Sequence, residues 1–366
     1  MVRRRWLPLA VAGSFVFVLA ALLPAPEELR VAPFDRYGEA IADGSVPYRD
    51  FALEYPPGAL PPIVVPALVP GVSYEIAFRS LEILLGVVLV LGTAYLLRDA
   101  RPLELAAGVA LVAGLPFLLG TVVVHRFDLY PALLVTASLV ALERSRDRSA
   151  GAFIGLALAA KAYAGAVVPP LGAFLVATRG SGAAMRALAA AALAAVVVAL
   201  PLAVVAPGGV ASAVLRQTDR ELQIESVGAS LLLAHGAPEV EFVGGSWSLV
   251  GSPAREIATA STVAGAVSLT ILWLVAFRGR ERLGDPALVC ALAVAVVLVF
   301  SKVLSPQFLV WLVPLVALVR GRSVSPPARS SAPRACSPGS CIRTATTSSS
   351  QTTVYLWHFS RFETDC

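Results

Sequence analysis

Residues 3–37 read RRRWLPLAVAGSFVFVLAALLPAPEELRVAPFDRY, and this stretch decides what kind of protein the chain forms. Three arginines are followed by an apolar run from Trp6 to Leu23, which is long enough to cross a hydrocarbon core as a helix. Loops rich in Arg and Lys stay on the cytoplasmic side of a membrane. The run therefore begins inside the cell, and the polar loop that carries Asp35 is expected outside.

The same stretch also fits a cleaved signal peptide, because Ala25, Pro26 and Glu27 follow a basic and then apolar start. We expect an uncleaved first span instead. Many further spans follow it, and Pro26 is poorly suited to a cleavage site.

Composition supports an integral membrane protein. The chain has 366 residues, of which 57% are hydrophobic and 14% are charged, and its mean hydropathy is +0.77. A soluble domain is usually about 25% charged. The alternation that a membrane β-barrel needs is absent. The net charge of +5 comes from arginines clustered on one side, so we read it as membrane topology and not as nucleic-acid binding.

Hydropathy and arginine placement predict an all-α, polytopic fold of about ten transmembrane helices, with both termini in the cytoplasm. After the first span, apolar segments are expected at 74–97, 103–123, 129–142, 150–178 (two short helices meeting near Lys161), 187–206, 257–277, 286–300 and 303–319. The segment 60–70 is too short and proline-rich to cross alone, so it is expected to be re-entrant or interfacial.

These segments define the expected domain organisation. Residues 1–322 form the transmembrane domain, with a first outer loop at 25–58 and a large outer loop at 207–252. The tail at 323–366 is dominated at first by Ser, Thr, Pro, Ala and Arg, a composition that cannot pack a core. We expect it to be a disordered cytoplasmic tail.

Ionisable residues outside the arginine-rich inner turns are predicted to gather at the outer face. They come from separate segments of the chain: Asp35, Glu54, His125, Asp128, Lys161, Arg216, Arg220, Glu225 and Lys302. A single face that collects acids and cations from so many segments predicts a site built from loops.

The first outer loop is the densest part of this set. Asp35, Arg36 and Tyr37 open a predicted helix that continues to Ala42 and ends at Asp43. An acid at a helix start is favoured by the helix dipole. Asp35 could therefore be a helix cap, and Tyr37, Tyr48 and Tyr55 an interfacial aromatic belt. These residues alone do not separate that interpretation from a catalytic one.

The order of several short motifs resembles one family. The motifs are FDRY at 34–37, GSVPY at 44–48, EYPP at 54–57, RFD at 126–128, KAY at 161–163 and KVLSPQF at 302–308. Taken together, these motifs make the chain resemble the GT-C superfamily of membrane glycosyltransferases over roughly residues 5–320. Within that superfamily it most closely resembles the family 87 mannosyltransferases, known as the DUF2029 group. Each motif alone is weak, and their order and shared sidedness carry the resemblance.

The resemblance implies a function. Asp35 falls on the acid that acts as general base in that family, and the implied donor is a polyprenyl-phosphate sugar, commonly mannose. The sugar would pass with inversion to a glycolipid or glycan acceptor of the cell envelope. A carboxylate must come within about 3 Å of the attacking hydroxyl, and a single base opposite the leaving group gives inversion.

A phosphate leaving group needs cations aimed at it. The candidates for binding the donor phosphate are Lys161, Arg216, Arg220 and Lys302. The two lysines could instead snorkel from helix ends to the interface. Arg216, Arg220 and Gln223 have helical spacing, which would suit a helix along the membrane surface, either facing the lipid phosphate or held by internal ion pairs.

The remaining motif residues are candidates for binding substrate: Arg36, Tyr37, Tyr48, Glu54, Tyr55, His125, Arg126, Asp128, Tyr163, Glu225 and Gln307. His125, Arg126 and Asp128 could instead form a structural cluster, with an interfacial ion pair of little net value. No metal site and no cofactor are expected, because Asp35 lacks an obvious carboxylate partner.

Two rival functions remain open from the sequence. A multi-span transporter or lipid flippase would place polar groups near the bilayer midplane and break helices in two related halves. A GT-C fold that has lost activity is the third possibility. We expect the enzyme, in the cell membrane, with its active site outside the cytoplasm and with membrane lipids around it.

Overall fold

The computed structural model describes residues 6–24, 31–236, 239–279 and 285–319. All of them belong to the first of two compact units, residues 1–326. The predicted tail at 323–366 lies outside the described residues, as does the arginine triplet before Trp6.

The described part of the chain is predominantly helical, which confirms the all-α prediction. The main apolar helices are α1 (Trp6–Ala21), α4 (Tyr74–Leu96), α8 (Leu129–Glu143), α9 (Asp147–Ala160), α10 (Val168–Arg179), α11 (Ser181–Val205), α14 (Ser252–Arg278), α15 (Pro286–Phe300) and α16 (Leu309–Val319). Within the described ranges, α4, α11 and α14 are long and apolar enough to cross a membrane by themselves. The number of spans remains a prediction.

The segment 103–123, predicted as a single span, is not one continuous helix. The structure divides it into α5 (Pro102–Ala113), α6 (Leu115–Leu119) and α7 (Val122–His125). Gly120 has φ +73°, a left-handed conformation that ends α6 and that a residue with a side chain rarely adopts. Hydropathy does not detect this break, because the flanking residues are apolar on both sides.

The proline-rich segment at 60–70, which was expected to be re-entrant or interfacial, does not form one long helix. It forms η2 (Pro57–Ala59), α3 (Leu60–Val64) and η3 (Val65–Leu68). Its prolines lack the N–H groups that a longer helix needs. α3 and η3 pack beneath α2 (Phe34–Ala42), where Gly38 permits a close approach: a Cβ there would lie 2.5 Å from the Ile63 carbonyl oxygen.

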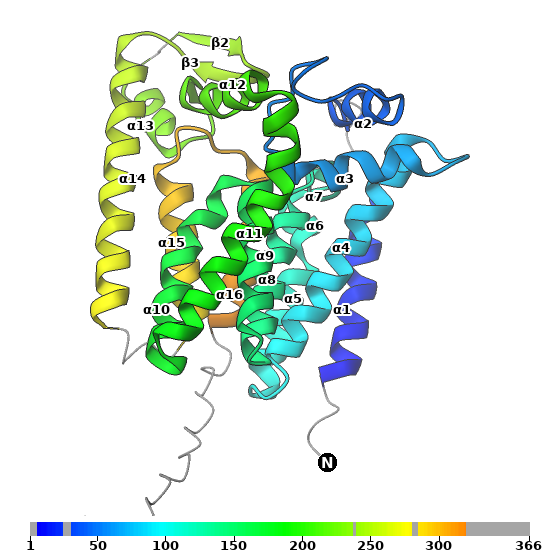
Figure 1. The fold of residues 1–366 in the computed structure, drawn as a ribbon, viewed down its shortest axis with the longest axis vertical. Helices are drawn as coiled ribbons and strands as arrows, with labels where there is room; N and C mark the ends of the chain where they lie inside the picture. The colour runs from blue at the N-terminus through cyan, green and yellow to red at the C-terminus, as the bar shows by residue number, and fades with distance from the viewer. Residues whose placement is uncertain (1–5, 25–30, 237–238, 280–284, 320–366) are drawn as a thin grey trace, which may run out of the picture. The chain divides into compact units, whose positions relative to one another are not determined.

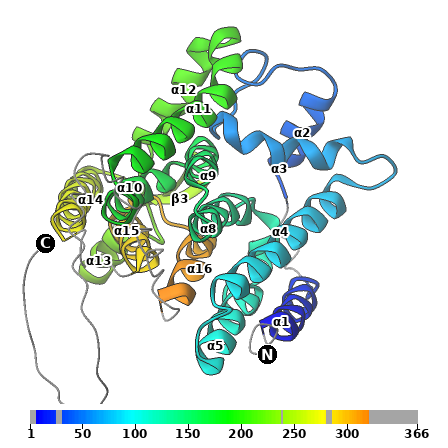
Figure 2. The same cartoon turned by 60° about the horizontal axis from the view of Figure 1, so that its bottom comes forward.

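The helices pack around one large buried apolar cluster drawn mainly from α1, α4, α5, α8, α9, α10, α15 and α16. Helix α9 and helix α11 lie side by side (Figures 1 and 2). The predicted pair of short helices at 150–178 is confirmed as α9 and α10, which are separated by Lys161 and η4 (Ala162–Val167).

The large outer loop forms a small mixed cap. It contains α12 (Pro207–Thr218), β1 (Leu222–Gln223), α13 (Val227–His235), β2 (Val240–Val243) and β3 (Ser246–Leu249). The strands form an antiparallel sheet in the order β1-β3-β2, in which Gln223 pairs with Ser248 and Phe242 with Trp247. Figure 1 shows this cap at the same end of the helices as α2.

The predicted surface helix through Arg216 and Gln223 is wrong beyond Thr218. The backbone N–H of Gln223 donates to the Lys302 carbonyl oxygen at 2.9 Å, and the residue pairs with Ser248 in the sheet. These tertiary hydrogen bonds override the helical spacing of the sequence.

Candidate active site

Asp35 lies in the first turn of α2, and its side chain is partly exposed. Its carboxylate accepts a hydrogen bond from the Arg36 backbone N–H at 2.8 Å. Pro33 occupies the cap position of the helix, and no side chain caps it. Asp35 is therefore not the helix cap, although the helix dipole still favours its negative charge.

Phe34 anchors this end of α2. Its side chain is 1% exposed, and its ring stacks on Phe78 at 5.5 Å and meets Phe127 edge-on at 5.5 Å. The Arg126 guanidinium lies 5.9 Å from the centre of the same ring. Because Phe34 is fixed on side chains of α4 and of the turn before α8, its neighbour Asp35 is held above the first turns of these two helices.

Tyrosines tie the first outer loop together. The Tyr48 hydroxyl donates to the Tyr55 carbonyl oxygen at 2.5 Å, and the Tyr55 ring meets Phe127 at 5.1 Å. Burial raises the pKa of Tyr55 above its usual value, and the nearby carboxylate of Glu54 acts in the same direction. Tyr37 stacks on Phe51 at 5.7 Å. Tyr37 and Tyr48 make these contacts within the loop and Tyr55 packs on Phe127, so these side chains position the loop.

Lys161 and Asp128 form a nearly dry ion pair. The Lys161 ammonium lies 2.6 Å from the Asp128 carboxylate, and the two side chains are 17% and 1% exposed. The Trp311 indole N–H donates to the same carboxylate at 2.8 Å. The ammonium also lies over the rings of Phe127, Phe308 and Trp311 at 4.7, 4.9 and 5.1 Å, and Tyr163 stacks on Trp311 at 4.1 Å.

A second polar group joins the two outer loops. The Arg220 guanidinium lies 3.6 Å from the Glu54 carboxylate and donates to the Ser246 hydroxyl at 3.3 Å. The Lys302 ammonium donates to the Thr218 carbonyl oxygen at 2.6 Å. Burial raises the pKa of the Tyr37 hydroxyl and the Glu54 carboxylate acts in the same direction, whereas the charges of Arg36 and Arg216 lower it.

Not every predicted residue joins these groups. His125 is fully buried and turned away, with its Nδ1 bonded to the Thr121 carbonyl oxygen at 2.7 Å and its Nε2 3.9 Å from Glu75. Arg36 and Glu225 are exposed. Gln307 is partly buried in η6 (Pro306–Phe308), beside the ring cluster.

Two residues of this region were not predicted from the sequence. Trp311 bonds Asp128, but a tryptophan in an apolar run carries no separate signal. Glu82 is a fully buried acid within α4, and its carboxyl interacts electrostatically with Asp128 and Lys161. A signal for Glu82 was present, because an ionisable residue inside a membrane span is a functional candidate by default.

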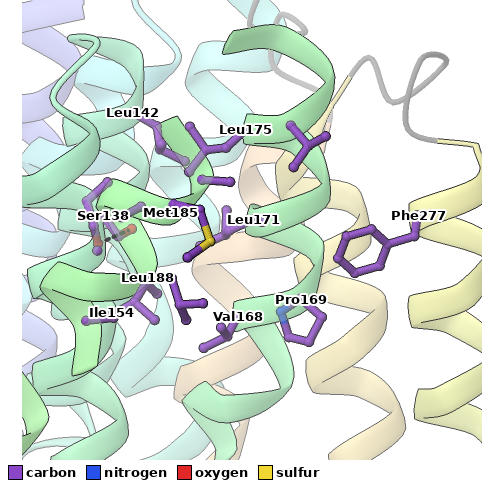
Figure 3. Close-up of a pocket in the computed structure, with 17 residues that line it drawn as sticks. Ser138, Leu142, Ile154, Val168, Pro169, Leu171, Leu175, Met185, Leu188 and Phe277 are labelled. Atoms are coloured by element: carbon purple, nitrogen blue, oxygen red, sulfur yellow. Dashed lines mark hydrogen bonds between the residues drawn. The ribbon is translucent and has the colours of Figure 1, made fainter. Parts of the chain in front are cut away.

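A cavity of about 360 Å³ lies away from these groups, between α8, α9, α10, α11 and α14. Figure 3 shows the aliphatic side chains that line it, with Met185 from α11 and Phe277 from α14. Its lining includes none of the predicted site residues. The loop-built site is therefore distinct from this cavity.

The apolar helices of the described residues indicate a polytopic membrane protein, and its fold is similar to that of a solved GT-C membrane enzyme. A sequence model described as glycosyltransferase family 87 matches residues 53–306, which is more than half of the chain. The chain belongs to glycosyltransferase family 87. The matched range begins after Asp35 and ends at residue 306, so it includes the four candidate cations and Asp128 but neither Trp311 nor the candidate base.

Among solved structures, the chain is similar to ArnT from Cupriavidus metallidurans, crystallised with undecaprenyl phosphate bound. The TM-score is 0.51 at 20% sequence identity, and the match covers 86% of this chain. The chain spans only 58% of the length of ArnT, so the likeness concerns the fold. A search of curated proteins found no match.

Proposed function

We propose that the protein transfers a sugar, in the first instance mannose, from a polyprenyl-phosphate donor to a hydroxyl of a cell-envelope glycolipid or glycan. Membership of glycosyltransferase family 87 supports the reaction class. The similarity to ArnT, whose structure holds undecaprenyl phosphate, supports the lipid-phosphate donor. The site would lie outside the cytoplasm, where the arginine-poor loops are expected.

Asp35 is the proposed general base. Its carboxylate accepts the proton of the acceptor hydroxyl as that oxygen attacks the anomeric carbon. A bond forms from the acceptor oxygen to this carbon while the bond to the phosphate oxygen breaks, and the electron pair leaves with the lipid phosphate. One base on the face opposite the leaving group inverts the anomeric configuration.

The leaving phosphate needs positive charge held in place before the reaction. Lys302 donates to a neutral carbonyl oxygen, and that contact does not cancel its charge. Arg220 is held by Glu54 at 3.6 Å, and its planar fork of donors suits a phosphate. Arg216 and Lys161 complete the proposed set, with Lys161 presenting the partly exposed end of its pair with Asp128.

The observation that carries this proposal is the position of Asp35. The Phe34 anchor fixes a partly exposed carboxylate above α4 and α8, and Glu54 of the same loop pairs with Arg220 at 3.6 Å. The loop that carries Asp35 thus joins the loop that carries Arg216 and Arg220 at one end of the described helices (Figure 1).

The test is turnover of a radiolabelled polyprenyl-phosphate mannose by purified protein with native membrane acceptors. Asp35→Asn should lower turnover by about 10²–10⁴-fold, as expected for loss of a general base. Asp43→Asn is the matched control, because it removes the same charge at the exposed other end of α2.

Unchanged turnover in Asp35→Asn would exclude this residue as the base. If wild-type protein shows no turnover but moves the labelled lipid across vesicle membranes, and Asp35→Asn still does so, the transporter function is correct instead.

A further inference from the structure

Glu82 is an acid within the membrane-spanning region that the proposed mechanism does not use. It lies about 12 Å along α4 from Tyr74, at 1.5 Å per residue, and is fully buried. Neither of its carboxyl oxygens has a hydrogen-bond partner among the described residues. Such a group is expensive to bury unless it is neutral or paired.

Glu82 interacts electrostatically with two charged side chains, Asp128 at the start of α8 and Lys161 at the end of α9. Tyr163 is part of the same cluster, and its buried hydroxyl also lacks a partner among the described residues. Three buried oxygen atoms of Glu82 and Tyr163 are thus unsatisfied beside one ion pair.

Several elements packed against α4 add no ionisable group. The sequences of α1, α3, η3 and α16 contain no ionisable residue. On the other packed helices, Glu104 bonds Arg101, Glu143 bonds Arg98, and His125 faces Glu75. Helix α8 also carries Tyr130, and α4 itself carries Arg79 and Tyr74. The Tyr74 hydroxyl donates to the Ile63 carbonyl oxygen and interacts electrostatically with Glu82.

A charge count places one proton on the two acids. Lys161 supplies one positive charge against Asp128 and Glu82. If both acids were ionised, the buried cluster would carry a net negative charge without compensation. Asp128 receives hydrogen bonds from Lys161 and Trp311, whereas Glu82 receives none within the described chain. The proton therefore resides on Glu82.

This cluster is one aromatic layer beneath the candidate base. Phe78 lies one helical turn before Glu82 and stacks on Phe34, while Phe127 contacts both Phe34 and the Lys161 ammonium. Lys161 is the most exposed member of the cluster, at 17%. The charge state of Glu82 therefore contributes to the electrostatic potential at Lys161.

We propose that Glu82 is a positioning residue that must stay protonated for the anionic donor to bind. With neutral Glu82 the cluster is uncharged and its Lys161 ammonium is outermost. When Glu82 loses its proton to water, the cluster becomes negative and repels the donor phosphate. This inference rests on the lipid-phosphate donor proposed above.

The experiment measures binding of a polyprenyl-phosphate sugar to purified protein in detergent, between about pH 6 and pH 10. This donor is a phosphodiester, so its own charge stays constant over the range. The wild-type dissociation constant should rise by about tenfold or more at the alkaline end, as expected for a new unit charge near the phosphate. In Glu82→Gln the rise should be at most about threefold.

Glu256→Gln is the matched control, because it removes an exposed acid on α14, and its pH dependence should follow the wild type. If Glu82→Gln loses donor affinity at alkaline pH as the wild type does, the proposal is overturned and the loss of affinity is assigned to Lys161. If the wild type binds the donor equally well at every pH, the proposal for Glu82 is overturned, but the proposed donor still stands. No binding at any pH would refute the donor itself.

Infrared spectroscopy provides a second measurement that does not depend on the variant folding. Wild-type protein should show the C=O stretch of a protonated carboxyl group that disappears in step with donor affinity as the pH rises. Donor affinity that falls while this band persists would also overturn the proposal.

Discussion

Asp128 shows how a single carboxylate can be held almost without water. One lysine and one indole N–H donate to it, and aromatic faces surround the lysine ammonium. The attraction within a buried ion pair is largely offset by the loss of hydration. Removal of one partner leaves the other charge buried and uncompensated, which costs about 3–5 kcal/mol. Removal of one partner is therefore expected to destabilise the protein more than replacement of both partners.

The Lys161→Met variant should be destabilised by about 3 kcal/mol, because Asp128 then keeps only Trp311 as a donor. The Lys161→Met/Asp128→Asn double variant should recover at least half of that loss, since no buried charge remains. Thermal unfolding in detergent measures both. If the double variant is as unstable as the sum of the two single variants, the two residues do not act as a pair.

At the scale of elements, the closest helix contact is made by α9 and α11. A Cβ at Gly151 would lie 1.9 Å from the Ala187 carbonyl oxygen, and one at Gly155 would lie 2.1 Å from that of Ala191. These positions are one turn apart on both helices, so the contact is a continuous seam. Small residues let helix backbones approach in a membrane, where lipid tails remove the hydrophobic drive for association.

Gly155→Ala should destabilise the protein by about 1–3 kcal/mol, because the added methyl group forces the two helices apart. Gly172→Ala is the control: it lies in α10, and a Cβ there meets nothing within 4 Å. That variant should be neutral or stabilised by up to about 1 kcal/mol from helix propensity. Equal melting temperatures for the two variants would show that the seam is not tightly packed in the membrane.

At the scale of the whole molecule, charge separates the two ends of the described bundle. The turns opposite the loop end carry arginines that acids partly neutralise, as in the Arg98–Glu143 and Arg179–Asp147 pairs, both at 2.6 Å. The loop end instead gathers segments from across the chain, so Arg220 meets Glu54 and Lys302 meets the Thr218 carbonyl. The positive-inside rule assigns the loop end to the exterior.

Cysteine labelling in intact cells tests this orientation in a cysteine-free background. A membrane-impermeant maleimide should label Arg36→Cys and Arg216→Cys, which are exposed at the loop end. It should label Arg101→Cys and Arg148→Cys, exposed at the other end, only after the cells are made permeable. The reverse pattern would place Asp35 in the cytoplasm and exclude the proposed reaction.

Much of the candidate site could be predicted because its residues lie in loops that hydropathy delimits. The α2 helix was expected from Asp35 to Ala42, and the structure has it at Phe34–Ala42. The outer cap could not be predicted in this way, since its strands are only two to four residues long. Their pairing depends on partners far away in the sequence, including the Lys302 carbonyl.

The sequence by itself determined the class of fold, the sidedness expected for its loops and the break at Lys161, because hydropathy, charge and proline content act locally along the chain. Only the tertiary structure decided which charges meet. Asp128 and Trp311 are 183 positions apart, and Glu82 reaches the same cluster from a third helix. Contacts of this kind follow from helix packing, which no local pattern of residues encodes.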